Sequence, residues 1–448
     1  MANIAPTGAT LIAYNVGFGD CILLRIAYDD ESRRHVLFDF GSTAMPETTE
    51  PPPKGNAKRA NPRSLEEVAN KIAEDCGGSL DVVVVTHRHR DHISGFAGKP
   101  GKVIAGLNPK IVLQPWTEDP EIPEDAHGPA AGGSASGSTR GLRLGDVALG
   151  LHNLELAAQQ IVDIVPELKA RKGVTKTASQ QIEAIGMNNV KNREAIENIQ
   201  KLSGKHEYLH FGNKLDLSAV LPGVKFDVLG PPSIDQSAEI TKMAEIDPAE
   251  FWHLAASSRP RTAQARAGRL FPHVEPMTRL PQEARWVIPK IDSMRAEELL
   301  SLVRIMDEVL NNTSLILLLT IGEARLLFPG DAQLENWRYA LQGAKNSQEI
   351  RETLANTTVY KVGHHGSLNA TPRQMLWENF ARRGKANTPG RLITVMSTRA
   401  NKHGSDDRST EVPRRTLKDE LAAKSNLFNT QDCDTKTQWW REIEVPID

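Results

Sequence analysis

The segment THRHRDH places His87, His89, Asp91 and His92 within six positions, directly after the β-branched run of residues 82–85. Such a run is typical of a strand that is buried on both faces. Residues two apart in an extended segment project to the same side, so His87 and His89 can converge on one cation while Asp91 and His92 reach a second. The alternative is a set of ordinary core or surface histidines, which would compete for scarce partners at this position. The spacing therefore predicts two neighbouring metal sites.

Two later segments repeat the order of an apolar strand followed by a metal-binding residue type. ARLLFPGDAQ places Asp331 after a glycine that permits a tight turn, and its two carboxylate oxygens could bridge a pair of cations. VYKVGHHGS places His364 and His365 after another strand. Each signal is weak alone, since Pro-Gly-Asp is an ordinary turn. Together with the first cluster they indicate one centre assembled from separate turns.

The elements that must position these residues alternate between strands and helices. Short apolar strands at the start of the chain predict an antiparallel meander, and SLEEVANKIAED, with its serine cap, predicts a helix. Strands return around Asp331 and the histidine pair, so we expect an α/β layer architecture. The expected strands cover residues 10–16, 21–28, 35–40, 82–85, 214–229, 314–320, 325–328, 357–362 and 391–397.

We expect one domain over residues 1–448, into which residues 105–213 and 231–312 are inserted as mainly helical or loop segments. Residues 153–201 have helical apolar spacing. HGPAAGGSASGSTRG, at residues 127–141, has the composition of a mobile linker.

Composition points to an ordinary protein of a reducing compartment. The net charge of -2 gives no global basic field for nucleic acid, so any polyanion site must be local. Three widely separated cysteines argue against a disulfide framework. The N-terminal residues lack the pattern of a secretory signal, and the most apolar run, residues 315–321, is too short to span a bilayer. We therefore expect a cytoplasmic protein without a membrane partner.

Taken together, the motifs resemble those of the metallo-β-lactamase fold superfamily. The motifs with this resemblance are LFDFG, THRHRDH, LLFPGD and KVGHHGS, in this order along the chain. Within the superfamily, NVGFGDCILL, NNTSLILLL and STRANKHG are similar to segments of the soluble hydrolase domain of the ComEC DNA-uptake family. The resemblance covers both halves of the chain and leaves out most of residues 105–205 and 235–300.

The resemblance implies an αββα sandwich with two divalent metal ions, zinc or manganese, at one edge of two facing sheets. His87 and His89 would bind the first ion, and Asp331 would bridge to the second. Asp39 would orient a metal ligand by accepting a hydrogen bond from it. The remaining ligands of the second ion would be Asp91, His92 and His365.

Two points of the implied ligand set stay open. Either His364 or His365 could touch metal; we favour His365, which leaves His364 to contact substrate or to give a proton to the leaving group. Many members of the superfamily supply a further histidine to the first ion, and no segment here matches that context. The available residues are His127, His152, His206, His210, His253 and His273. Manganese would tolerate oxygen and water ligands in place of that histidine.

The implied reaction is hydrolysis by a metal-activated hydroxide, in which Asp91, Asp331 and His364 take catalytic parts. The resemblance favours DNA phosphodiesters, so we expect a nuclease or phosphodiesterase with a nucleic-acid substrate. Weak candidates for contact with a substrate phosphate are Lys361, Ser367, Lys402 and His403. One alternative is a hydrolase of small esters, lactones or lactams. Another is a catalytically silent scaffold, but such a protein is expected to have lost metal ligands, and the ligand positions here all carry suitable residues.

Overall fold

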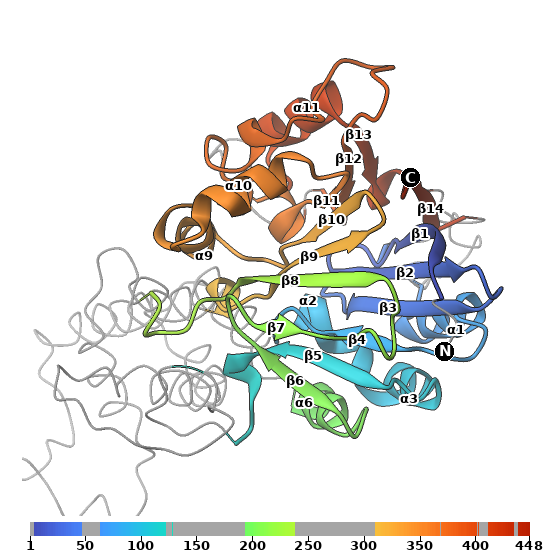
Figure 1. Cartoon of the computed structure of the whole chain (residues 1–448). Helices are drawn as coiled ribbons and strands as arrows, with labels where there is room; N and C mark the ends of the chain where they lie inside the picture. The colour runs from blue at the N-terminus through green and yellow to red at the C-terminus, as the bar shows by residue number, and fades with distance from the viewer. Residues whose placement is uncertain are drawn as a thin grey trace, which may run out of the picture.

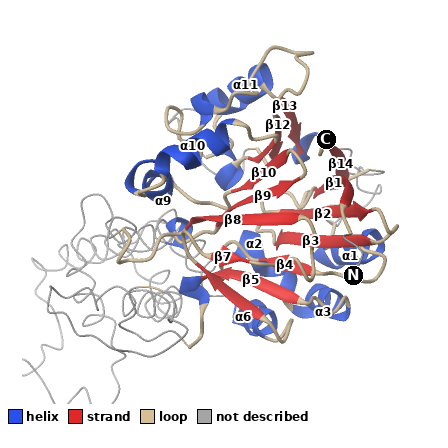
Figure 2. Cartoon of the chain, in the orientation of Figure 1, coloured by secondary structure: helices blue, strands red, loops and turns tan. Residues whose placement is uncertain are grey.

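The computed structural model describes residues 4–46, 63–121, 128, 193–237, 310–367, 369–400, 402, 411–433 and 438–448. Within these residues the strands form two seven-stranded sheets, and helices cover the outer face of each (Figure 1; Figure 2). The protein is thus of the mixed α/β class, and its layers are compatible with the expected sandwich. The linker predicted over residues 127–141 lies outside the described residues, apart from the single residue Gly128.

The first sheet has the strand order β14-β1-β2-β3-β4-β5-β6. Its strands are β1 (Pro6–Tyr14), β2 (Cys21–Tyr28), β3 (Arg33–Phe40), β4 (Val82–Val84), β5 (Ile111–Pro115), β6 (His206–Leu209) and β14 (Trp440–Val445). Strands β14, β1, β2 and β3 pair antiparallel, whereas β3, β4, β5 and β6 run parallel. Because β3 and β4 are parallel, their carboxyl ends lie at the same edge of the sheet.

The second sheet repeats this scheme with the order β13-β12-β11-β10-β9-β8-β7. Its strands are β7 (Lys214–Leu215), β8 (Val224–Gly230), β9 (Ile316–Ile321), β10 (Ala324–Phe328), β11 (Val359–Lys361), β12 (Ile393–Met396) and β13 (Asn426–Asn429). Strands β7 to β10 pair antiparallel, and β10 to β13 run parallel. The segments that follow β10, β11 and β12 therefore leave the sheet at one edge.

Apolar side chains of both sheets meet in one buried cluster between them. Phe38 of β3 and Phe328 of β10 stack within this cluster, with ring centroids 3.9 Å apart. Asp39 directly follows Phe38, and Asp331 follows Phe328 after a short turn. The contact that joins the sheets therefore also brings two of the predicted site residues to the same place.

Each sheet buries its other face under helices, because both faces of most strands are apolar. The helices on the first sheet are α1 (Leu65–Asp75), α3 (Gly98–Gly106) and α6 (Arg193–Gln200), and those on the second are α9 (Leu334–Arg338), α10 (Ser347–Ala355) and α11 (Arg415–Lys424). Helix α1 begins with a capping box, in which Ser64 Oγ accepts from the Glu67 backbone N–H at 3.2 Å and Glu67 accepts from the Ser64 N–H. This confirms the helix predicted from SLEEVANKIAED.

The sequence did not predict four strands of these sheets, namely β5, β6, β13 and β14. Strands β5 and β6 lie within residues 105–213, which were expected to be an insertion of helices and loops, so both ends of that segment carry parts of the first sheet. Strand β14 comes from the last residues of the chain and pairs with β1 at the other terminus. Whether such a short segment forms a strand depends on the strand with which it pairs, and the local sequence pattern does not reveal that partner.

No helix among the described residues is long and apolar enough to cross a membrane.

All three cysteines are free and buried, and burial raises the pKa of each thiol, that of Cys76 to about 12. Because the thiolate is the reactive form, we expect the native protein to react slowly with Ellman's reagent at pH 8. In guanidinium chloride all three thiols should react at once. Fast reaction of the native protein would show that the packing around these cysteines is looser than described.

Candidate metal centre

The predicted site residues converge at the edge where the parallel strands of both sheets end. Asp91 and His92 follow β4 and lie in α2 (Arg90–Ile93), Asp331 follows β10, and His365 follows β11 within η8 (Gly363–Gly366). One ligand atom from each of the four lies within 4.8 Å of the others, and three of the four side chains are fully buried. In sheets of this kind ligands bind beyond the carboxyl ends of strands. The four residues form what we call the outer group, and they could hold a metal ion.

Asp39 fixes the orientation of His92. Its Oδ1 accepts from the Thr86 backbone N–H and its Oδ2 from the Thr86 hydroxyl, both at 2.7 Å. His92 Nδ1 lies 2.7 Å from the same Oδ2, so its Nε2 points to Asp331 Oδ2 at 3.1 Å. Burial raises the pKa of Asp39, although the His92 charge opposes this. This is the arrangement in which a carboxylate orients a metal-binding histidine, as expected for Asp39.

Asp331 presents one oxygen to three imidazoles. Its Oδ2 lies 3.1 Å from His92 Nε2, 3.6 Å from His365 Nε2 and 3.8 Å from His364 Nε2. The preceding Gly330 has a φ of 56°, and a Cβ there would lie 2.7 Å from Thr86 Cβ. The turn into Asp331 therefore needs a glycine for both its conformation and its close approach to Thr86.

His365, rather than His364, belongs to the outer group. Its Nδ1 faces the Ser397 carbonyl oxygen at 3.0 Å, and this leaves Nε2 to face Asp91 Oδ2 at 3.1 Å. His364 and His365 both have positive φ values, 42° and 52°. His364 is the more exposed of the two, with a side chain 25% accessible. The turn thus directs the His365 imidazole into the outer group and leaves the His364 imidazole partly exposed to solvent.

His87 and His89 form a second pair of donors beside the outer group. His87 Nε2 lies 3.0 Å from His89 Nδ1, and the His87 ring centroid is 4.1 Å from that of His92. Burial, together with the charges of His92 and His89, holds the pKa of His87 well below its usual value. A neutral imidazole is the form that binds metal. The pair could therefore contribute to metal binding, although neither residue belongs to the outer group.

The loop that carries this pair is tied to the first sheet by an arginine. Arg88, between the two histidines, donates from Nε to both carboxylate oxygens of Glu118 at 2.9 Å. Glu118 is buried and lies in η2 (Trp116–Glu118), directly after β5. Arg88 Nη2 also lies 2.8 Å from Glu118 Oε2. Two guanidinium nitrogens therefore face one carboxylate, which restrains the loop more than a single hydrogen bond would.

Opposite charges stabilise each other throughout the outer group. Burial by itself favours the neutral form of every side chain in it. The carboxylates nevertheless raise the pKa of His92 well above its usual value and also raise that of His365. The imidazoles in turn lower the pKa values of Asp91 and Asp331. A bound cation would replace the positive charge of these imidazoles and displace their protons.

Sequence analysis missed the buried Asp20 as a site residue. Its carboxylate forms an ion pair with the Lys361 ammonium, and its oxygens lie 3.7 Å from His92 Nδ1 and from His365 Nδ1. The signal was present in VGFGD, an aspartate after two glycines between buried strands, but the resemblance gave it no role. Asp20, Asp39 and His92 form a second set of three that could hold a cation, which we call the inner group.

Two glycines allow the backbone of α2 to approach this part of the site. A Cβ on Gly19 would lie 2.2 Å from the Gly41 carbonyl oxygen, and one on Gly41 would lie 2.6 Å from the Arg90 carbonyl oxygen. The Asp20 backbone N–H also donates to the Asp91 carbonyl oxygen at 2.9 Å. The turns after β1 and β3 therefore hold Asp91 and His92 in place through direct backbone contact.

Of the four residues expected to bind a substrate phosphate, the structure describes Lys361, Ser367 and Lys402. The Lys361 side chain is only 4% exposed and its ammonium faces Asp20, so this position does not suit a contact with substrate. Ser367 is half-buried and follows the histidine turn, and Lys402 is exposed. His403 lies outside the described residues. Of the six histidines considered for the first ion, His206 lies beside Gln114 and Ser203 and His210 beside Asn213, and the other four are not described.

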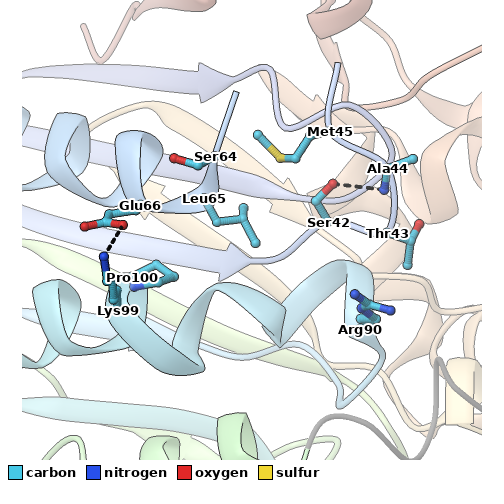
Figure 3. Close-up of a pocket in the computed structure, with 10 residues that line it drawn as sticks. All are labelled: Ser42, Thr43, Ala44, Met45, Ser64, Leu65, Glu66, Arg90, Lys99 and Pro100. Atoms are coloured by element: carbon cyan, nitrogen blue, oxygen red, sulfur yellow. Dashed lines mark hydrogen bonds and ion pairs between the residues drawn. The ribbon is translucent and has the colours of Figure 1, made fainter. Parts of the chain in front are cut away.

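A surface hollow of about 450 Å³ opens beside α2 (Figure 3). Arg90, which stands between two predicted metal ligands in the sequence, lines this hollow, as does Lys99 at the start of α3. Lys99 lies 3.7 Å from Glu66. The other lining residues are Glu66, Ser42, Thr43, Ala44, Met45, Ser64, Leu65 and Pro100. Arg90 thus lines the hollow directly beside Asp91 and His92 in α2, whereas Lys99 lies next to the acidic Glu66.

A scan against protein-family models found no matching model, and a search of curated proteins found no match either. The fold and the geometry of the site define an α/β protein with a buried Asp/His centre that could hold a metal ion.

If Asp39 orients His92 for metal binding, Asp39→Asn should weaken metal binding by roughly 10- to 100-fold, the usual effect of losing such a partner. The measurement is calorimetric titration of the metal-free protein with Mn²⁺ or Zn²⁺. Asp81→Asn is the matched control, because Asp81 is also buried and accepts from the His35 N–H and from Lys110, but precedes β4. Equal losses in both variants would contradict a specific role for Asp39.

Proposed function

We propose that this protein is a metal-dependent hydrolase with the metallo-β-lactamase fold, similar to the ComEC hydrolase domain, and that it cleaves phosphodiester bonds in DNA. The observation that carries the proposal is the convergence of Asp91, His92, Asp331 and His365 within 4.8 Å. These residues come from three separate turns of two sheets. Buried ionic groups are weak stabilisers compared with apolar side chains, so a functional reason for this arrangement is the better explanation.

We further propose that two divalent ions bind here. The outer group would hold one, and His87 and His89 would hold the other, with Asp331 between them. The donor set of imidazole nitrogens and carboxylate oxygens suits zinc and manganese. Among the described residues, neither His206 nor His210 joins the site. An ion that accepts water ligands would not need a further histidine, and manganese accepts them more readily than zinc.

Such ions supply a water of lowered pKa and stabilise the charge that develops on a phosphodiester. The protein's own residues then have distinct tasks. Asp39 and the Ser397 carbonyl oxygen orient His92 and His365. His364, which is 25% exposed and lies 3.8 Å from Asp331 Oδ2, would give a proton to the leaving oxygen.

The preference for DNA rests on the resemblance to the ComEC hydrolase domain and on local charge. Arg90 lines an open hollow beside α2, where its charge would attract a polyanion, whereas Lys99 in the same hollow pairs with Glu66. A hydrolase of small esters, lactones or lactams would use the same metal chemistry. The two functions differ in the substrate, which a panel of substrates can identify directly.

Asp331→Ala should lower the bound metal and abolish hydrolysis, because Asp331 would touch both ions. The far-UV circular dichroism spectrum should remain nearly unchanged. Metal content is measured by mass spectrometry on the same samples. Asp419→Ala, at an exposed position of α11, should match the wild type in both assays. Full activity of Asp331→Ala would remove the argument for a dinuclear centre.

If DNA is the substrate, cleavage of linear or plasmid duplex should require added manganese or zinc and should fall steeply as salt rises, because phosphate contacts are screened. Gel assays with the metal-free protein, with each ion and with Asp331→Ala test this. Hydrolysis of bis-p-nitrophenyl phosphate or of acyl esters, without cleavage of any nucleic acid, would favour the small-molecule alternative.

A further inference from the structure

Lys361 is a buried cation at the base of the site. It is the last residue of β11, and its side chain is 4% exposed. The ammonium pairs with Asp20 Oδ2 and lies 3.9 Å from Asp331 Oδ1. Asp331 therefore faces Lys361 with one oxygen and the imidazoles with the other. The ammonium stands between the inner and the outer group.

The carboxylates of the inner group could bind a cation, but their oxygens already accept hydrogen bonds or pair with an ammonium group. Both oxygens of Asp39 accept hydrogen bonds from Thr86, and Asp20 pairs with Lys361. A small cavity of about 10 Å³ lies between them, lined by Asp20, Asp39, Thr86 and Lys361 together with Ile22, Phe38, Phe328 and Gly330. A cavity of this size has room for about one water molecule. Removal of the lysine side chain would enlarge it.

We propose that the Lys361 ammonium is the resident cation of the inner group, and that it confines metal ions to the outer group and the His87–His89 pair. Lys361 is thus a positioning residue: it holds Asp20 and turns the inner oxygen of Asp331 away from the metal. The inference rests on the proposed function for the identity of the outer site, but it concerns the number of ions bound and not the reaction.

The physical reason is the balance of charge in a buried volume. Asp20 and Asp39 lie beneath the outer group, and a buried carboxylate without a counter-charge is strongly unfavourable. The Asp39 carboxylate already faces the His92 imidazole, so the carboxylate that needs a further positive charge in the folded protein is that of Asp20. An ammonium supplied by the chain is always present, and its charge repels a divalent ion from the inner group at short range.

The test is Lys361→Met, which removes the charge and keeps much of the length of the side chain. We expect this variant to bind one more Mn²⁺ per chain than the wild type, counted by mass spectrometry after dialysis. Its melting temperature should also rise more on addition of Mn²⁺, because the ion would supply the missing charge. Lys361→Arg keeps the charge and should bind the wild-type number of ions. Lys345→Met, at an exposed position, controls for loss of a lysine.

Equal Mn²⁺ counts in Lys361→Met and the wild type would overturn the proposal. If Lys361→Met fails to fold even with Mn²⁺, the double variant Asp20→Asn/Lys361→Met removes both charges of the pair. A folded double variant with the wild-type ion count would support the proposal, and an unfolded one would overturn it. If the wild type binds no metal, the proposed function fails, whereas an ion gained by Lys361→Met would still support the role of Lys361.

Discussion

Four carboxylates lie close together in the site and repel one another. The site can therefore form only if each of them has a hydrogen-bond donor or a positive charge beside it. Asp20, Asp39, Asp91 and Asp331 lie close together at one sheet edge, and three of them are almost completely buried. Each has a specific counterpart: a lysine for Asp20, a threonine and an imidazole for Asp39, and imidazoles for the other two. Because the dielectric constant there is low, these pairings are strong, and loss of any one leaves an uncompensated charge.

The two sheets bring these carboxylates and their partners together because both have the same arrangement of strands. Each begins with antiparallel strands and continues with parallel ones, so several strand ends open at one edge. The first sheet supplies Asp39 and the β4 turn, and the second supplies Asp331 and His365. The stacked rings of Phe38 and Phe328 hold the two sets of turns at a fixed separation. The apolar core between the sheets thus sets the geometry of the polar centre.

Close backbone approach completes the arrangement. Gly19 and Gly41 leave no room for a side chain where the turns after β1 and β3 contact α2. These contacts let the backbone itself support Asp91 and His92, so the ligand segment depends little on flexible side chains. Arg88 also donates a hydrogen bond to Glu118, which connects the loop that carries His87 and His89 to the end of β5. A centre held in this way is preorganised before any ligand arrives.

The sequence by itself determined the class of the fold and most of the polar residues at the centre. Strand patterns, the cap of α1 and the ligand-rich turns are local features, and each can be recognised within a few residues. Asp331 and His365 could be named because each follows a strand and lies in a glycine-containing turn.

Only the tertiary structure decided which of these residues meet. It placed His365 rather than His364 in the outer group, because the Ser397 carbonyl oxygen fixes the orientation of that ring. It also placed Lys361 beneath the centre beside Asp20, and it paired β14 with β1. These outcomes depend on contacts between segments far apart in the chain, and a local pattern carries no information about which distant charge or strand will complete it.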